Sequence, residues 1–156
     1  MRKLQLLLMI GVSGLSITAC GSAEYEKIGS EFLPYVETYE REVGGSAAEL
    51  TVKFADRDHA TMRPRELNRP VTLGICYISS IGNLDAGRRI EINPHTWPEL
   101  DESEREAIMF HELGHCVHTL DHVDDRLHVM NSMVPLRQWW DLRDSLIQGL
   151  IELIGR

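Results

Sequence analysis

The sequence has little positive charge, and it has none of the repeats that mark fibrous or low-complexity proteins. Its 156 residues include 16 Lys and Arg against 24 Asp and Glu, for a formal net charge of −8 at pH 7. This balance argues against a nucleic-acid partner. Because the sequence has no repeat, charge block or biased tract, collagen-like, coiled-coil and low-complexity classes are excluded. The hydrophobic content of 43% predicts one globular domain with a single core.

The sequence has one long apolar run, and it lies at the N-terminus. Two basic residues precede the apolar stretch 4–17 and small residues follow it, which is typical of a secretory signal and too short for a typical transmembrane helix. The stretch 17–20 reads ITAC and resembles a bacterial lipobox, whose cysteine is acylated and becomes the first residue. The alternative is an ordinary signal peptide that ends beside a cysteine. We expect a lipoprotein signal peptide at 1–19, a lipidated Cys20 with a tether at 20–27, and a folded domain at 28–156.

The predicted lipidation site also indicates a location. Gly21, rather than aspartate, follows Cys20, which resembles the outer-membrane sorting pattern of bacteria with two membranes. Acyl chains on Cys20 would hold the domain at a bilayer surface without a spanning helix. We therefore expect an envelope protein anchored in the outer membrane and facing the periplasm. In that oxidising compartment Cys76 and Cys116 are compatible both with a disulfide and with two buried free thiols.

Hydrophobic periodicity predicts the order helix, three strands, helix, loop, helix. Ser30 is a candidate cap of the first helix. The alternating strand 88–93 carries Arg and Glu, which suits an edge position, whereas the apolar strand 70–79 is a candidate central strand. An acidic first turn with a capping-box spacing opens the second helix at Asp101. The predicted helices span 28–43, 101–118 and the chain from 135 on, and the strands span 49–55, 70–79 and 88–93.

Five of the seven histidines lie between His111 and His128. The stretch from His111 to His115 has the pattern HExxH within a predicted helix. Side chains at i and i+4 share one helix face, so both imidazoles can reach one Zn²⁺. Glu112 lies beside them and can take a proton from a zinc-bound water and pass it to a leaving amine. The pattern therefore predicts zinc as the cofactor.

A catalytic zinc ion has a third protein ligand and an open position. His118 continues the same helix face, but it lies about 10 Å along the axis from His111, too far to share an ion on an unbroken helix. The third ligand must come from chain that has left the helix and turned back, which leaves Asp121 and His122. A fourth ligand from His118 or His128 would instead close the site as structural zinc.

These residues resemble the metzincin zinc peptidases, which combine HExxH, a ligand just after the helix and a methionine turn beneath the metal. His111 and His115 match the first two ligands, and Glu112 matches the catalytic acid/base. Met130, in Val-Met-Asn, matches the turn methionine. The string HELGHC, followed by His122 and Val-Met-Asn-Ser, is similar to a group of small bacterial metallopeptidases.

The resemblance covers the stretch 111–133 and departs from the metzincin pattern in its connection. That pattern has glycine where this chain has His118, and its third ligand where this chain has Asp121. The closer bacterial pattern favours His122, which is the ligand we expect, with Asp121 as the alternative. Without glycine, the exit from the helix depends on residues 119–120.

The resemblance implies an α/β (α+β) fold, a compact metzincin-like domain with a small mixed sheet, an active-site helix and a C-terminal helix. In metzincins an edge strand before the active-site helix pairs with the substrate backbone, which places this role on 88–93. The expected function is zinc-dependent hydrolysis of peptide or protein substrates at the cell envelope. The alternative is a non-catalytic zinc-binding lipoprotein with a structural or scaffolding role.

Overall fold

The computed structural model describes residues 25–57, 61–62, 64, 71–78 and 87–156. The predicted signal peptide and Cys20 lie outside these ranges. Tyr25 donates a hydrogen bond to Glu40, and Ile28 forms a parallel bridge with Val52, so the described chain is packed against the fold from its first residues. No helix in the described part is long and apolar enough to cross a membrane.

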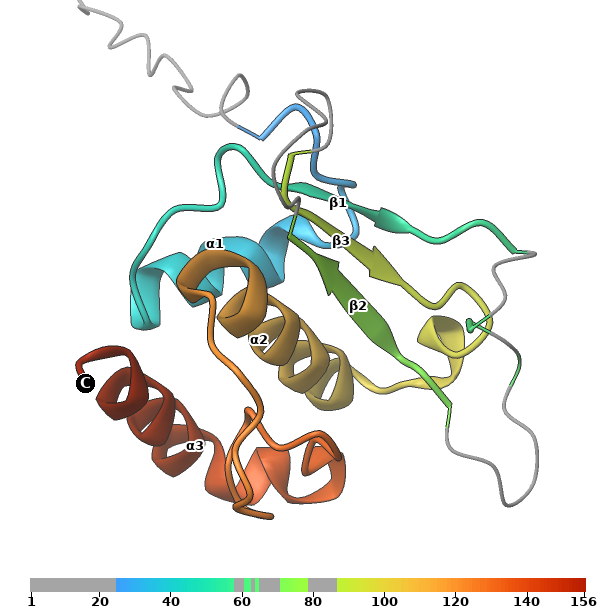
Figure 1. Ribbon diagram of the computed structural model, residues 1–156. Coiled ribbons are helices and arrows are strands. Elements are labelled where there is room, and N and C mark those ends of the chain that lie inside the picture. The colour runs from blue at the N-terminus through green and yellow to red at the C-terminus, as the bar shows by residue number, and fades with distance from the viewer. Residues whose placement is uncertain (1–24, 58–60, 63, 65–70, 79–86) are drawn as a thin grey trace, which may run out of the picture.

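The described residues form three α-helices and a three-stranded mixed sheet, which confirms the predicted α+β class and element order (Figure 1). The helices are α1 (Leu33–Glu42), α2 (Glu102–His118) and α3 (Trp139–Ile154). The strands are β1 (Thr51–Phe54), β2 (Gly74–Tyr77) and β3 (Arg89–Ile92), and short 3-10 turns cover Trp97–Glu99 and Leu136–Gln138.

The sheet has the strand order β1-β3-β2, with β1 parallel and β2 antiparallel to β3. The prediction that 88–93 is an edge strand is therefore wrong, and so is the central position expected for 70–79. Ile90 and Ile92 are fully buried, while Arg89 pairs with Glu91 and stacks over the Tyr77 ring at 4.0 Å. The charged side chains thus mark one face of a central strand, not an edge.

Helix α1 begins later than the sequence predicts. Phe32 is its N-cap, with no side-chain cap, and Pro34 lies in its first turn. Ser30 is therefore not the cap. Ile28 pairs with β1 instead of joining the helix, because its side chain is buried in the core beside the sheet.

Helix α2 lies between the sheet and α3 (Figure 1) and also contacts α1. An aromatic row joins the three helices: the Tyr39 ring lies 5.1 Å from the Phe110 ring, which lies 5.4 Å from Trp139. Arg143 of α3 pairs at 2.8 Å with carboxylates of both α1 and α2, Glu42 and Glu106. Helix α2 carries the HExxH pattern, and these contacts hold the face of α2 that points away from the sheet.

Candidate metal centre

The predicted capping box opens α2 and fixes where its turns begin. The Asp101 carboxylate accepts the Glu104 N–H at 2.9 Å, and the Glu104 carboxylate accepts the Asp101 N–H at 3.1 Å. From this start the helix continues for 17 residues. His111 and His115 therefore lie on one face, with their Nε2 atoms 3.1 Å apart.

The chain leaves α2 through Thr119, whose backbone is left-handed with φ 59°. The Leu120 N–H then closes the turn on the Gly114 carbonyl at 3.2 Å. A β-branched residue in this conformation costs about 1–2 kcal/mol, so the surrounding contacts must hold it there. The exit turns the chain back toward the helix and brings His122 to the two helical histidines.

The three imidazoles converge on one point. The Nε2 atom of His122 lies 3.2 Å from that of His115 and 3.3 Å from that of His111. Four-coordinate zinc with Zn–N distances of about 2.0–2.1 Å places its nitrogens roughly 3.3 Å apart. The triangle formed by the three nitrogens therefore has the size of one face of a tetrahedral site.

The hydrogen bonds of the rings show why a cation belongs between them. The Nδ1–H of His111 donates to the Val129 carbonyl at 2.7 Å, and the Nδ1–H of His115 donates to the Leu120 carbonyl at 2.5 Å. A carbonyl only accepts, so in both neutral rings Nδ1 carries the proton and Nε2 carries a lone pair. Two lone pairs about 3 Å apart repel each other unless a proton donor or a positive ion lies between them, and a metal ion can bind both at once.

Burial keeps two of these ligands neutral. It lowers the pKa of His111 to about 4, and it also lowers the pKa of His115. Neutral imidazole is the form that binds metals. The site is therefore ready to bind a cation at neutral pH without first losing protons from these two rings.

Within the described residues, only His111, His115 and His122 bring ligand atoms close enough together to hold an ion. Asp121 lines the adjoining cavity instead. His118 Nε2 lies 3.3 Å from the Gly44 carbonyl, and His128 accepts the Met130 N–H. The described residues thus form a three-histidine centre with no fourth protein ligand.

Glu112 is buried beside this centre, with 5% of its surface exposed. Its carboxylate lies beneath Gly74 of β2, where a Cβ atom would approach Oε1 to 2.8 Å. The backbone N–H of Cys76 donates to it, and burial raises the pKa of Glu112 to about 8. A bound dication nearby would favour the charged form and act against this shift.

Met130, the residue expected from the resemblance to be a turn methionine, packs against helix α2 at Gly114. The side chain of Met130 is fully buried. Its sulfur lies only 2.5 Å from the position that a Cβ atom of Gly114 would take, so no larger residue fits there without a shift. The preceding residue, Val129, supplies the carbonyl that orients His111. Residues 129–130 therefore contact both the ring of His111 and the helix that carries it.

A cavity of about 780 Å³ opens from the three histidines and Glu112. The segment 71–76, Met133 and Val134 also line this cavity. Strand β2 pairs with β3 along one edge, and no other strand of the described chain pairs with its second edge. The site therefore combines a metal-binding triangle, a buried carboxylate and a cavity beside a strand edge.

No family model, curated protein or solved structure matches this chain. The interpretation of the site therefore rests on its own geometry. That geometry can bind and polarise a ligand at the metal and can exchange a proton through Glu112.

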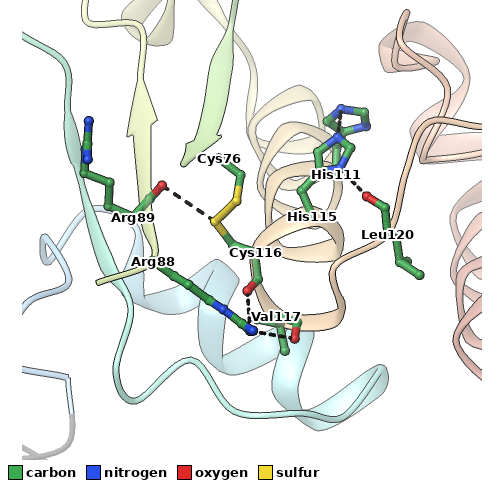
Figure 2. Close-up of a disulfide and its surroundings, with 8 residues drawn as sticks. All are labelled: Cys76, Arg88, Arg89, His111, His115, Cys116, Val117 and Leu120. Atoms are coloured by element: carbon green, nitrogen blue, oxygen red, sulfur yellow. Dashed lines mark hydrogen bonds between the residues drawn. A yellow bond between two sulfur atoms is a disulfide. The ribbon is translucent and has the colours of Figure 1, made fainter. Parts of the chain in front are cut away.

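Cys76 and Cys116 form a disulfide, with their Cα atoms 5.6 Å apart (Figure 2). The sequence left this pairing open. Sequence reasoning also missed Gly74 and the Cys76 N–H as neighbours of Glu112, because no local pattern indicates which strand lies over the HExxH helix. A glycine two residues before a cysteine in a predicted strand was the only signal available.

Proposed function

We propose that this protein is a zinc-dependent peptidase. The observation that carries the proposal is the buried Glu112 carboxylate beside three convergent histidine nitrogens, in a cavity bordered by a strand edge. A structural zinc site has four protein ligands, whereas catalytic sites keep a position open. Three ligands among the described residues favour catalysis over the alternative of a non-catalytic zinc lipoprotein.

Bound zinc would polarise the scissile carbonyl and lower the pKa of a water molecule to about 7. Glu112 takes the proton from the attacking water and delivers it to the leaving amine as the peptide bond breaks. The Cys76 N–H orients this carboxylate, and the Val129 and Leu120 carbonyls keep the ligating nitrogens of His111 and His115 free of protons.

The cavity suits a peptide in extended conformation. Residues 71–76 line it along β2, which lies at the edge of the sheet formed by the described strands, and an extended backbone can add to a sheet edge through main-chain hydrogen bonds. This proposal gives β2 the substrate role that the resemblance to metzincins implied for 88–93. Peptides and unfolded protein segments are therefore the substrate class that fits.

The test is hydrolysis of a quenched-fluorescent peptide library by the zinc-loaded protein and by its Glu112→Gln variant. Glutamine keeps the size of the side chain but cannot accept the proton, so we expect a rate loss of about 10²- to 10⁴-fold at equal zinc content. Equal cleavage by both proteins, or cleavage by neither, would refute a peptidase that uses Glu112.

The N-terminal sequence supports a location at the envelope. We propose that acylated Cys20 anchors the domain in the outer membrane on its periplasmic side. Labelled palmitate should be incorporated by the wild-type chain and not by Cys20→Ala. Equal incorporation by both chains, or incorporation by neither, would contradict a lipid anchor on Cys20.

A further inference from the structure

The disulfide joins the two walls of the proposed active site. Cys76 lies on β2, the strand that borders the cavity, and Cys116 follows the zinc ligand His115 on α2 (Figure 2). Cys116 is fully buried. The covalent bond therefore connects the substrate-facing strand directly to the helix that carries His111, Glu112 and His115.

Two contacts show how closely β2 is fitted to Glu112. The carboxylate lies so near Gly74 that any side chain there would collide with it. Two residues along, the Cys76 N–H donates to the same carboxylate. A small change in the distance between β2 and α2 would therefore break this hydrogen bond or push the carboxylate away from the metal centre.

The central strand β3 is linked to the C-terminal end of α2 by hydrogen bonds and not by a covalent bond. Arg88, just before β3, donates to the Cys116 and Val117 carbonyls at 3.0 and 3.3 Å (Figure 2). These bonds fix β3, but β2 lies at the sheet edge and pairs only with β3 among the described strands. The disulfide is thus the direct covalent constraint on the distance between β2 and the helix.

We infer that the Cys76–Cys116 disulfide is a positioning element of the reaction, which holds the Cys76 N–H on the Glu112 carboxylate and the edge of β2 beside the metal centre. This inference rests on the proposed function. A disulfide also stabilises a protein by restricting its unfolded chain. The test must therefore separate positioning from stabilisation.

The test compares the zinc-loaded full-length chain with its Cys76→Ser/Cys116→Ser variant, below the melting temperature of both. Displacement of a catalytic group by about 1 Å costs roughly 100-fold in rate, so we expect kcat to fall by at least about tenfold while zinc content stays at one per chain. Hydrogen exchange at the amides of residues 74–77 should become faster, while exchange in α3 stays unchanged. Arg143→Met is the matched control, since it destabilises the contacts among helices and leaves β2 and its disulfide in place.

Wild-type kcat and unchanged exchange in β2, with only a lower melting temperature, would overturn the inference. If the double variant does not fold, reduction of the disulfide in the folded wild-type chain by a phosphine decides: lower kcat at full zinc content supports positioning by the disulfide, and unchanged kcat refutes it. If the wild-type chain cleaves no peptide, the proposed function fails. Exchange at β2 then still tests whether the disulfide positions the strand.

Discussion

Burial of the Glu112 carboxyl group gives the zinc-free protein a pH dependence that its glutamine variant should lack. Burial raises the pKa of Glu112 from its ordinary value of 4.5 to about 8. Between these values the folded chain keeps a proton that the unfolded chain releases, so the free energy of unfolding falls as pH rises through this window. Within this window the free energy of unfolding falls by about 1.4 kcal/mol for each pH unit. The loss between pH 4.5 and pH 7 is therefore about 3 kcal/mol.

Glutamine at this position is neutral at every pH and can still accept the Cys76 N–H. We therefore expect Glu112→Gln to exceed the wild type in free energy of unfolding by about 3 kcal/mol at pH 7, and by little at pH 4.5. Urea unfolding of both proteins, treated with a chelator and followed by circular dichroism from pH 4.5 to pH 8, measures this difference. The other ionisable groups cancel between the two proteins.

Zinc provides the control for this prediction. A dication beside the carboxylate favours its charged form, so the advantage of glutamine should shrink or reverse when both proteins carry zinc. A stability difference that does not change with pH in the zinc-free proteins would refute the reasoning. It would mean that Glu112 is solvated and not enclosed beneath β2.

Three further predictions concern the support of the centre. Gly114→Ala would bring a Cβ to within 2.5 Å of the Met130 sulfur, and we expect a loss of about 1–3 kcal/mol in thermal unfolding together with weaker zinc binding; wild-type values would contradict the packing. Burial lowers the pKa of His111 to about 4, so this ring is already neutral at pH 5.5. Zinc binding to the Glu112→Gln chain at this pH should therefore release fewer than two protons, as calorimetry in several buffers would measure. Release of three protons would contradict the burial of His111. Arg143→Met removes ion pairs to two carboxylates and should lower stability by about 1–3 kcal/mol without changing zinc affinity, as urea unfolding and zinc titration would show.

The local part of the site could be predicted from the sequence. The capping box at Asp101 and the spacing of His111 and His115 depend on residues within a few helical turns, and the structure confirms the helix. The third ligand remained open between Asp121 and His122, because it depends on which residue takes the left-handed conformation. Thr119 takes this conformation, and it stands one residue after the position where the metzincin pattern has glycine. His122, which reaches the centre, likewise stands one residue after the position of the third metzincin ligand.

The order of the strands could not be predicted, because pairing between strands is not encoded locally. The charges of β3 suggested an edge, but Arg89 and Glu91 project from one face of a central strand whose other face carries buried Ile90. The contacts between β2 and Glu112 depend on this order. The sequence alone therefore could not predict that Gly74 and the Cys76 N–H lie beside Glu112.

The most direct test of the three-histidine centre is the zinc dissociation constant of the wild type, His122→Ala and Asp121→Ala, measured by competition with a chromophoric chelator. We expect about one zinc per chain in the wild type and in Asp121→Ala. The affinity for zinc should be weaker by at least about 100-fold in His122→Ala, since the loss of a ligand costs more than the 10- to 100-fold caused by loss of a supporting group. Weak binding by Asp121→Ala with tight binding by His122→Ala would show that Asp121, and not His122, is the third ligand.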